Sequence, residues 1–387
     1  MQENMIWVDE AIENIRQKMA WVSDKNQDKV PYTTLADGSY DDRSQNWLNW
    51  WTNGFWGGVM WLMYQDTKEQ KYADYAQALE DKIEKIVLDF YEVDHDSGFM
   101  FHLTAGANYR LTGNTHSRRT NLHAANLLAG RFNPAGSFIR AWNGLAESKH
   151  IPENEPLDRD VRGWAIIDCL MNLPHLYWAS KETRDPRFYN VAVKHADMAL
   201  EHFFFPDGSV KHIVEFDPFT GEMIKNYGGQ GYDEDSAWSR GQAWAAHGFT
   251  LSYIHTNDKK YLDAAKKVAN FCIANLREDG LVPLDFKQPA EPAWEDSCGA
   301  CILASGLLEL ARQVPDDEKE IYENAAVKIL KAIYDLRTDF SQECDAIVQN
   351  CSAAYHDEPG RHITMVYADY FFIEAIQKLK NIGISLW

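Results

Sequence analysis

Residues 161–180 read VRGWAIIDCLMNLPHLYWAS, a run that sets a single carboxylate, Asp168, among apolar and aromatic side chains. Burying a carboxylate without partners costs free energy or raises its pKa. We therefore expect Asp168 to have either a structural partner, such as a loop that it caps, or a chemical task. Helical spacing would place Trp164 and Asn172 on the same face as Asp168, and Pro174 would kink the helix.

Outward from this run, apolar periodicity and helix start and stop signals predict twelve helical segments. Strand-like stretches are few and short. The helical segments cover residues 5–22, 54–66, 69–91, 98–112, 115–131, 162–181, 185–204, 236–256, 258–276, 296–313, 315–337 and 364–381.

These segments alternate in character. One set, 69–91, 115–131, 185–204, 258–276 and 315–337, is amphipathic and charged, whereas the segments between them are apolar on nearly every face and rich in Gly and Ala. A helix that is apolar all round belongs in an interior, and a half-charged helix belongs outside. The alternation predicts an all-α fold, an (α/α)6 toroid of six inner and six outer helices, with residues 1–387 as a single domain. The inner-helix starts would converge at one end, where we expect a pocket.

The composition restricts the function. With 38 Lys and Arg against 58 Asp and Glu, the formal net charge is −20, which argues against a nucleic-acid or anionic-membrane partner. An anionic small substrate remains compatible, because a few local cations can override the global field. No run of about 18 apolar residues occurs, and residues 1–15 lack a basic segment followed by an apolar core. We therefore expect a cytoplasmic enzyme with reduced cysteines, in which Cys298 and Cys301 are core residues rather than a zinc or redox pair.

Aromatic residues are numerous, at 14 Trp, 18 Tyr and 18 Phe. A large helical core accounts for most of them, but carbohydrate pockets also use such rings as stacking platforms.

Polar residues recur in the loops ahead of the predicted inner helices. Each one alone could be a helix cap or a solvated ion-pair partner, but together at one end they indicate a pocket. Two carboxyls there, Asp96 and Asp168, beside aromatic rings suggest general acid and base catalysis on a sugar. The loops read NWWTNGFWGG (49–58), DHDSGF (94–99), AWNG (141–144) with DVRGWAIID (160–168), VKHIVEFDP (210–218), GGQGYDEDSAWSRGQAW (228–244), DSCGA (296–300) and AYHDEPGRH (355–362).

Other chemistries lack their motifs. The sequence has no GxSxG, no P-loop and no GxGxxG followed by a strand, which argues against serine-hydrolase and nucleotide-binding functions. No His pair has HExxH spacing, and the scattered Asp and His residues do not make a metal set.

Five stretches carry a family resemblance: WTNGFWGGVMWL (51–62), HDSGF (95–99), IIDCLMNLPHLYWA (166–179), FDPFTG (216–221) and DSAWSRGQAW (235–244). On these motifs the chain resembles the unsaturated glucuronyl hydrolases of glycoside hydrolase family 88, over nearly its whole length. It departs from that family by extra residues in the loop LAESKHIPENEPLDRD (145–160), which we expect to reshape a rim of the pocket.

The resemblance implies an (α/α)6 barrel that acts on oligosaccharides left by polysaccharide lyases, whose non-reducing end is a 4,5-unsaturated uronic acid. It implies that Asp168 is the general acid and base, that Asp96 is a second essential carboxylate, and that no metal or cofactor takes part. Arg240 and His212 would hold the substrate carboxylate. The residues that match the family's pocket positions are Trp51, His95, Trp142, His212, Gln230, Arg240, Trp244 and His356. We expect a monomer or a weak homo-oligomer.

Alternatives remain at this stage. An unsaturated rhamnogalacturonyl hydrolase would share the barrel and the chemistry but act on pectin fragments. A sugar epimerase on the same barrel would need two His side chains close together in the pocket, and a non-catalytic sugar-binding toroid would leave Asp168 without a task. Arg361 and His362 could contact a sulfated aglycone or could be solvated loop residues.

Overall fold

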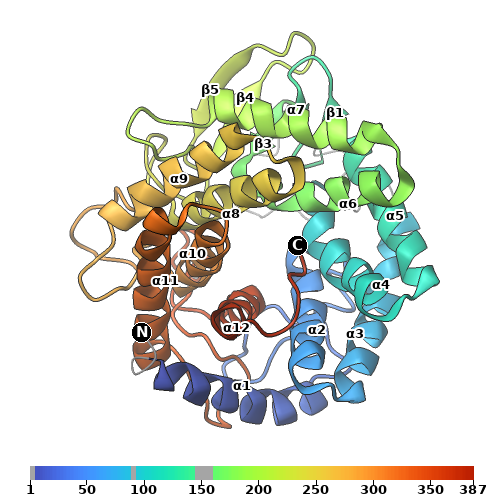
Figure 1. Ribbon diagram of the computed structural model, residues 1–387, viewed down its shortest axis with the longest axis vertical. Helices are drawn as coiled ribbons and strands as arrows, with labels where there is room; N and C mark the ends of the chain where they lie inside the picture. The colour runs from blue at the N-terminus through green and yellow to red at the C-terminus, as the bar shows by residue number, and fades with distance from the viewer. Residues whose placement is uncertain (1–4, 89–92, 144–159) are drawn as a thin grey trace.

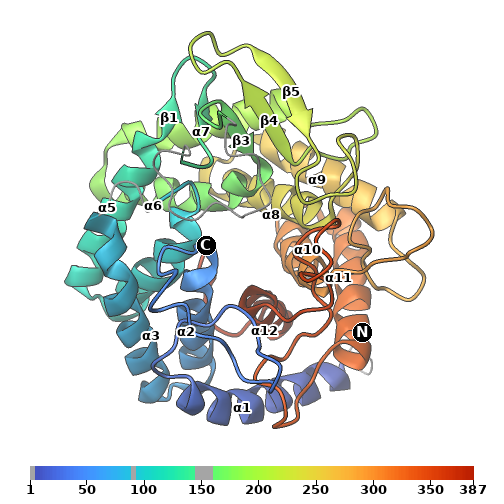
Figure 2. The ribbon, with the colours of Figure 1, turned by 180° about the vertical axis from the view of Figure 1, so that it is seen from behind.

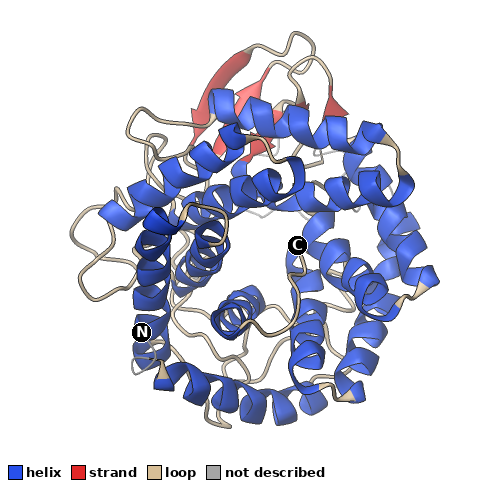
Figure 3. Cartoon of the chain, viewed as in Figure 1, coloured by secondary structure: helices blue, strands red, loops and turns tan. Residues whose placement is uncertain are grey.

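The computed structural model describes residues 5–88, 93–143 and 160–387, and most of these residues are helical (Figure 3). Half of the helices form an outer layer that buries one face and exposes the other. In α7, for example, Phe188, Ala192, Ala196 and Ala199 recur at helical spacing on the buried face. The outer helices of the described residues are α1 (Ile6–Lys25), α3 (Gln70–Ile83), α5 (Thr115–Gly130), α7 (Pro186–His202), α9 (Lys259–Ala274) and α11 (Asp316–Leu336).

The inner helices are buried on nearly all sides. Every residue of α10 is buried, because this helix packs against α8, α11 and α12. The inner layer of the described residues consists of α2 (Phe55–Thr67), a π-helix η4 (Gly98–Gly106) that continues as α4 (Ala107–Thr112), α6 (Leu173–Thr183), α8 (Ser239–Thr256), α10 (Ser297–Ala311) and α12 (Val366–Lys380).

The inner layer closes on itself, as Figure 1 shows. Starting from α2, the contacts run to η4, then through the 3-10 helix η5 (Ile167–Asn172) to α8, α10 and α12, and α12 contacts α2 again. This closed ring of alternating inner and outer helices confirms the predicted (α/α)6 toroid. Within the described residues, no helix has the length and apolar character that crossing a membrane requires.

The predicted helix over residues 162–181 is wrong in its first half. A strand, β3 (Trp164–Ile166), comes first, then η5, and α6 begins only at Leu173. Pro174 therefore lies in the first turn of α6, where a missing N–H does no harm, and it does not kink a longer helix. Pairing with a distant strand overrides the helical periodicity of this segment. The backbone at Gly163 approaches that strand closely, because a Cβ at this position would lie only 1.8 Å from the carbonyl oxygen of Phe216.

That pairing places a histidine beside Asp168. The sheet has the order β3–β4–β5, with β4 (Ile213–Phe216) antiparallel to both β3 and β5 (Met223–Tyr227). Ile166 lies opposite Ile213, and the Ile167 N–H donates to the carbonyl of His212 at 3.0 Å. A second hairpin joins β1 (Phe132–Asn133) and β2 (Phe138–Ile139).

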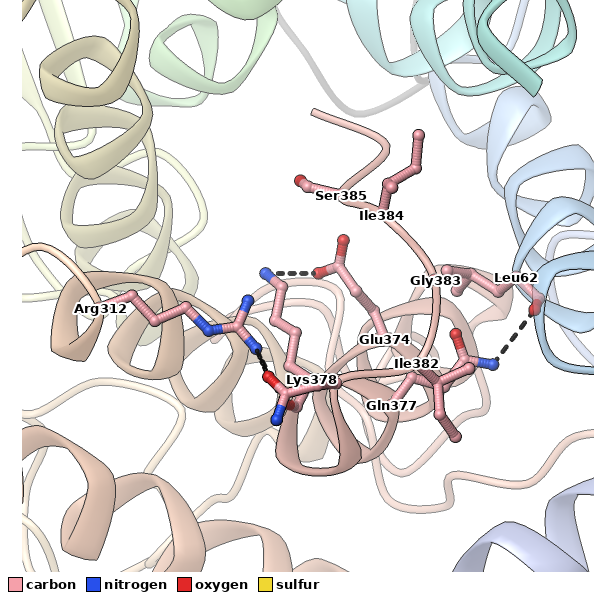
Figure 4. Close-up of a pocket in the computed structure, with 10 residues that line it drawn as sticks. Leu62, Arg312, Glu374, Gln377, Lys378, Ile382, Gly383, Ile384 and Ser385 are labelled. Atoms are coloured by element: carbon pink, nitrogen blue, oxygen red, sulfur yellow. Dashed lines mark hydrogen bonds and ion pairs between the residues drawn. The ribbon is translucent and has the colours of Figure 1, made fainter.

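The two ends of the barrel differ. Figure 2 shows the face crossed by the loops that lead into α2 and α12. At the other end, the last residues of the chain fold into the ring, where the Ile384 N–H donates to Gln65 and Arg110 donates to the carbonyl of Leu386. The small pocket beside them contains Lys378, which lies 3.3 Å from both Glu374 and Glu309, so its charges are paired internally (Figure 4).

Candidate active site

Asp96 and Asp168 lie at the starts of two neighbouring inner helices. Asp96 stands two residues before η4, Asp168 is the second residue of η5, and η4 contacts η5. Their side chains are 9% and 15% exposed, so both carboxyls are largely buried but keep a small exposed part. The Oδ1 atom of Asp168 is buried and has no hydrogen-bond partner, and His212 Nε2 lies 3.9 Å from it.

This environment sets the protonation of Asp168. Burial and the neighbouring negative charge of Asp96 raise its pKa to about 7, and the positive charges of His95 and Arg240 oppose that rise only in part. At neutral pH the carboxyl is therefore divided between its protonated and ionised forms. Such a group can give a proton and take one back, as a general acid and base must.

Asp96 has more partners. Asn172 Nδ2 donates to its Oδ1 at 3.0 Å, and His95 Nε2 lies 3.3 Å from its Oδ2. Burial lowers the pKa of His95, but the charge of Asp96 and hydrogen bonds to Asp96 and Cys169 outweigh burial, and the pKa stands well above its ordinary value. Asp94 is also close: burial and the charge of Asp96 raise the pKa of Asp94 to about 6.

His212 places its Nε2 atom 3.9 Å from Asp168 Oδ1. Its Nδ1 lies 3.0 Å from the Gln230 peptide N–H, which can only donate, and 3.1 Å from the Gly228 carbonyl. The Gln230 N–H favours an unprotonated Nδ1, whereas the Gly228 carbonyl favours a protonated one, so the two contacts permit either tautomer of the neutral ring. Burial, with the charges of Arg240 and His95, lowers the pKa of His212 to about 3, so the ring is neutral at physiological pH.

Arg240 lies behind the site. Its side chain is 1% exposed, and its guanidinium donates to Asp296 at 2.7 Å and to the carbonyls of Ser352 and Ala353. The ring of Trp238 packs against the guanidinium, 4.6 Å from its carbon, and against His212, with centroids 4.2 Å apart. In this structure Arg240 therefore supports the loops of the site, and its expected contact with the substrate carboxylate stays a prediction.

The three predicted tryptophans differ in position. Trp51 is half-buried against Tyr367, with ring centroids 4.9 Å apart, and Trp142 is half-buried against Trp164, with centroids 5.6 Å apart. Both residues are partly exposed. Trp244 is completely buried and packs between Phe99 and Phe371, so the structure places it in the core beneath the site rather than on a pocket wall.

Gln230 and His356 belong to a loop layer above α8. Gln230 Nε2 donates to the carbonyl of Ala353 at 2.9 Å, and the Tyr355 N–H donates to the carbonyl of Gln230 at 2.9 Å. His356 is exposed, and its Nε2 lies 2.9 Å from the carbonyl of Tyr232. These contacts join the 228–232 and 353–356 segments, which places both residues at the rim.

The loop with possible aglycone contacts lies near this rim. Arg361 stacks on Trp294 at 4.3 Å, and His362 contacts Asn350, so each already has a partner within the chain. The extra residues predicted to reshape the rim fall mainly at 144–159, outside the described residues.

The structure also reveals residues that sequence reasoning missed. Trp238 and Tyr367 contact the predicted site residues directly, and both stand at the start of an inner helix, α8 and α12. The predicted site residues also lie at or just before the starts of inner helices, and this shared position was the signal that could have identified Trp238 and Tyr367. Within residues 5–88, 93–143 and 160–387, no three His, Cys, Asp or Glu side chains gather as a metal ion would need.

Comparison with known proteins gives this geometry a context. The chain is 33% identical over 370 residues to the unsaturated glucuronyl hydrolase of Bacillus sp. (strain GL1), covering 93% of each chain. It is 28% identical over 382 residues to the unsaturated chondroitin disaccharide hydrolase of Streptococcus pneumoniae (strain ATCC BAA-255 / R6), covering 95% of this chain and 91% of that one.

A solved structure of a UGL variant with dGlcA-Glc-Rha-Glc superposes with a TM-score of 0.88 at 30% identity, covering 96% of this chain and 97% of that one. The family model described as Glycosyl Hydrolase Family 88 matches residues 16–378, so it spans the barrel and both candidate carboxylates. The chain therefore belongs to Glycosyl Hydrolase Family 88.

Proposed function

We propose that this chain is a glycosidase that releases the 4,5-unsaturated uronic acid from the non-reducing end of lyase-generated, glycosaminoglycan-type oligosaccharides. The observation that carries the proposal is Asp168, whose largely buried carboxyl has an oxygen without a partner and a pKa raised to about 7, at an inner-helix start of a family 88 barrel. The family relatives named for unsaturated glucuronyl and chondroitin substrates support the substrate class.

The chemistry follows from the substrate's vinyl ether, in which C4 and C5 are doubly bonded and the ring oxygen is attached to C5. Asp168 gives its proton to C4, and the positive charge that results at C5 is shared with the ring oxygen. Water then adds at C5, and Asp168 takes one proton from it. The resulting hemiketal opens and expels the aglycone, so the glycosidic bond breaks without displacement at C1. One carboxyl serves both proton transfers, so no second catalytic acid is needed.

The surroundings of Asp168 suit these steps. The Asp96 charge keeps the proton on Asp168 until it is used, and Nε2 of the neutral His212 ring, which lies 3.9 Å from Asp168, can hydrogen-bond to the attacking water. Trp51 and Trp142, which are partly exposed, can offer ring faces to the sugar. The expectations of a cytoplasmic location and a monomer or weak homo-oligomer stay predictions.

The test is the ultraviolet absorbance of the conjugated double bond, followed with unsulfated and sulfated unsaturated chondroitin disaccharides and with an unsaturated galacturonyl-rhamnose. The wild-type chain should consume the glucuronyl compounds, and Asp168→Asn should be inactive although folded. Turnover should also fall as pH rises through about 7, because the acid form of Asp168 is lost. Consumption of the rhamnose compound alone would favour the pectin alternative, and no consumption of any would contradict the proposal.

A further inference from the structure

Asn172, the last residue of η5, connects the two helix starts that carry the candidate carboxylates. Its Oδ1 accepts from the Phe99 N–H at 2.8 Å, and its Nδ2 donates to Asp96 Oδ1 at 3.0 Å. Both hydrogen bonds are buried, and the Asn172 side chain is fully shielded from solvent. Because the peptide N–H of Phe99 can only donate, it fixes which end of the amide carries oxygen. The group facing Asp96 must therefore be the NH₂ donor.

The backbone around this amide leaves room for it. A Cβ on Gly98 would lie 2.5 Å from Asn172 Oδ1 and 2.8 Å from the Asn172 Cα, too close for any side chain. The Phe99 N–H is one of the donors that the start of a helix leaves unpaired, so Asn172 caps η4 from a different element. The same amide therefore satisfies a helix start and reaches a carboxylate.

The two carboxylates consequently differ in their donors. Asp96 accepts a hydrogen bond from Asn172 and lies 3.3 Å from His95 Nε2, whereas the buried Oδ1 of Asp168 has no hydrogen-bond partner. We propose that Asn172 is a positioning residue for the reaction, which holds Asp96 as a hydrogen-bonded acceptor and so leaves the transferable proton on Asp168. This inference rests on the proposed function, because it assigns the proton to the carboxyl that gives it to C4.

The substitution Asn172→Asp separates positioning from capping. An oxygen at the same place still caps the Phe99 N–H, and Asp is as good a cap as Asn. At neutral pH, however, it replaces the donor to Asp96 with another negative charge. We expect kcat to fall about 100-fold at pH 7.5, as for other misplaced catalytic groups, with KM near the wild-type value. At pH 5 the loss should be smaller, because a protonated carboxyl at position 172 can again donate to Asp96.

A chemically matched control lies away from the site. Asn108 in α4 also donates from a buried amide to a buried carboxylate, Glu80, at 2.8 Å. Asn108→Asp therefore also replaces an amide donor with a negative charge beside a buried carboxylate. It should lower stability while leaving kcat unchanged. If Asn172→Asp does not fold at pH 7.5, Asn172→Ser provides an uncharged variant that replaces the amide donor to Asp96 with a shorter hydroxyl and should also lower kcat.

Thermal unfolding tests the role of Asn172 even if no substrate turnover can be measured. The melting-temperature deficit of Asn172→Asp relative to wild type should grow from pH 5 to pH 8, as the added carboxyl ionises against Asp96. A wild-type chain that consumes no unsaturated disaccharide would overturn the proposed function but not this comparison. A kcat for Asn172→Asp equal to that of wild type, or a deficit that does not change with pH, would overturn the positioning role.

Discussion

At the scale of single residues, the site depends on an imbalance between two carboxyls that share one end of the barrel. Asp96 accepts hydrogen bonds within the chain, whereas Asp168 keeps a buried oxygen without a partner and has its pKa raised to about 7. An ionised Asp168 in such a place destabilises the fold, since its small exposed fraction and the positive charges of His95 and Arg240 compensate for its burial only in part. We interpret this loss of stability as a cost of keeping a proton donor ready at neutral pH.

That interpretation predicts a gain in stability for Asp168→Asn. The ordinary pKa of 3.8 in the unfolded chain lies below the folded value of about 7, so burial of Asp168 costs nothing below about pH 4 and most above about pH 7. An amide has no charge at any pH. The variant should therefore match wild type near pH 3.5 and exceed it increasingly up to pH 7, by at most about 4 kcal/mol.

Urea unfolding at several pH values measures this difference. Asp235→Asn, at an exposed carboxyl in the loop ahead of α8, is the control and should change stability little at any pH. A stability difference for Asp168→Asn that is the same at pH 4 and pH 8 would mean that Asp168 is not a buried acid with a raised pKa.

The sequence predicted residues whose chemistry is unusual for their surroundings. It did not predict which way the side chains of other candidate site residues point. Asp168 could be predicted because a lone carboxylate in an apolar run needs an explanation. Arg240 and Trp244 match family pocket positions, but the sequence does not reveal that Asp296 and two carbonyls engage the guanidinium, or that Phe99 and Phe371 enclose the indole. Those contacts come from residues between about 50 and 145 positions away in the sequence.

At the scale of elements, the site is built where helices begin irregularly. The π-helix η4 and the 3-10 helix η5 face each other at the points that carry Asp96 and Asp168, and π-helical turns are frequent at functional sites. The periodicity of residues 162–181 predicted one helix because it registers only local spacing. The strand β3 forms because β4, about 50 residues later, supplies its hydrogen bonds.

The close approach of η4 and η5 predicts the effect of Gly98→Ala. The new Cβ would overlap Asn172, including its backbone, so the two helix starts must separate. We expect a loss of about 1–3 kcal/mol in unfolding free energy, as for other overpacked sites, together with a lower kcat. Gly130→Ala at the end of α5 is the control, since its Cβ meets nothing within 4 Å, and it should be neutral or stabilising. Equal unfolding free energies for Gly98→Ala and wild type would show that the contact between η4 and η5 can adjust to the added methyl group.

At the scale of the whole molecule, ring closure explains why the architecture was predictable from one sequence. A closed double ring needs inner helices that are apolar all round and outer helices with one charged face, and both properties are visible as composition along the chain. The sequence does not show how the far end of the barrel is closed. That closure depends on the final residues, whose burial inside the ring is evident only when α2, α4 and α12 surround them (Figure 1).

Trp387 closes that end, which leads to a prediction about the whole barrel. Its indole stacks on Phe371 at an interplanar angle of 6°, and its Nε1 donates to Glu374 at 2.9 Å. Trp387→Ala should cost about 3–5 kcal/mol, since it opens a cavity and removes a donor from a buried carboxylate. Ile384→Ala, in the same segment but 55% exposed, is the control and should cost less than about 0.5 kcal/mol.

Urea unfolding and kcat per folded molecule should then respond differently to Trp387→Ala. Stability should fall, and kcat should fall to a smaller extent, because the indole packs on Phe371 of α12 and also on Phe99 of η4, three residues after Asp96. A variant with normal stability would show that the indole does not close the barrel. A variant with an unchanged kcat at full folding would show that Phe99 and Asp96 keep their positions without the indole.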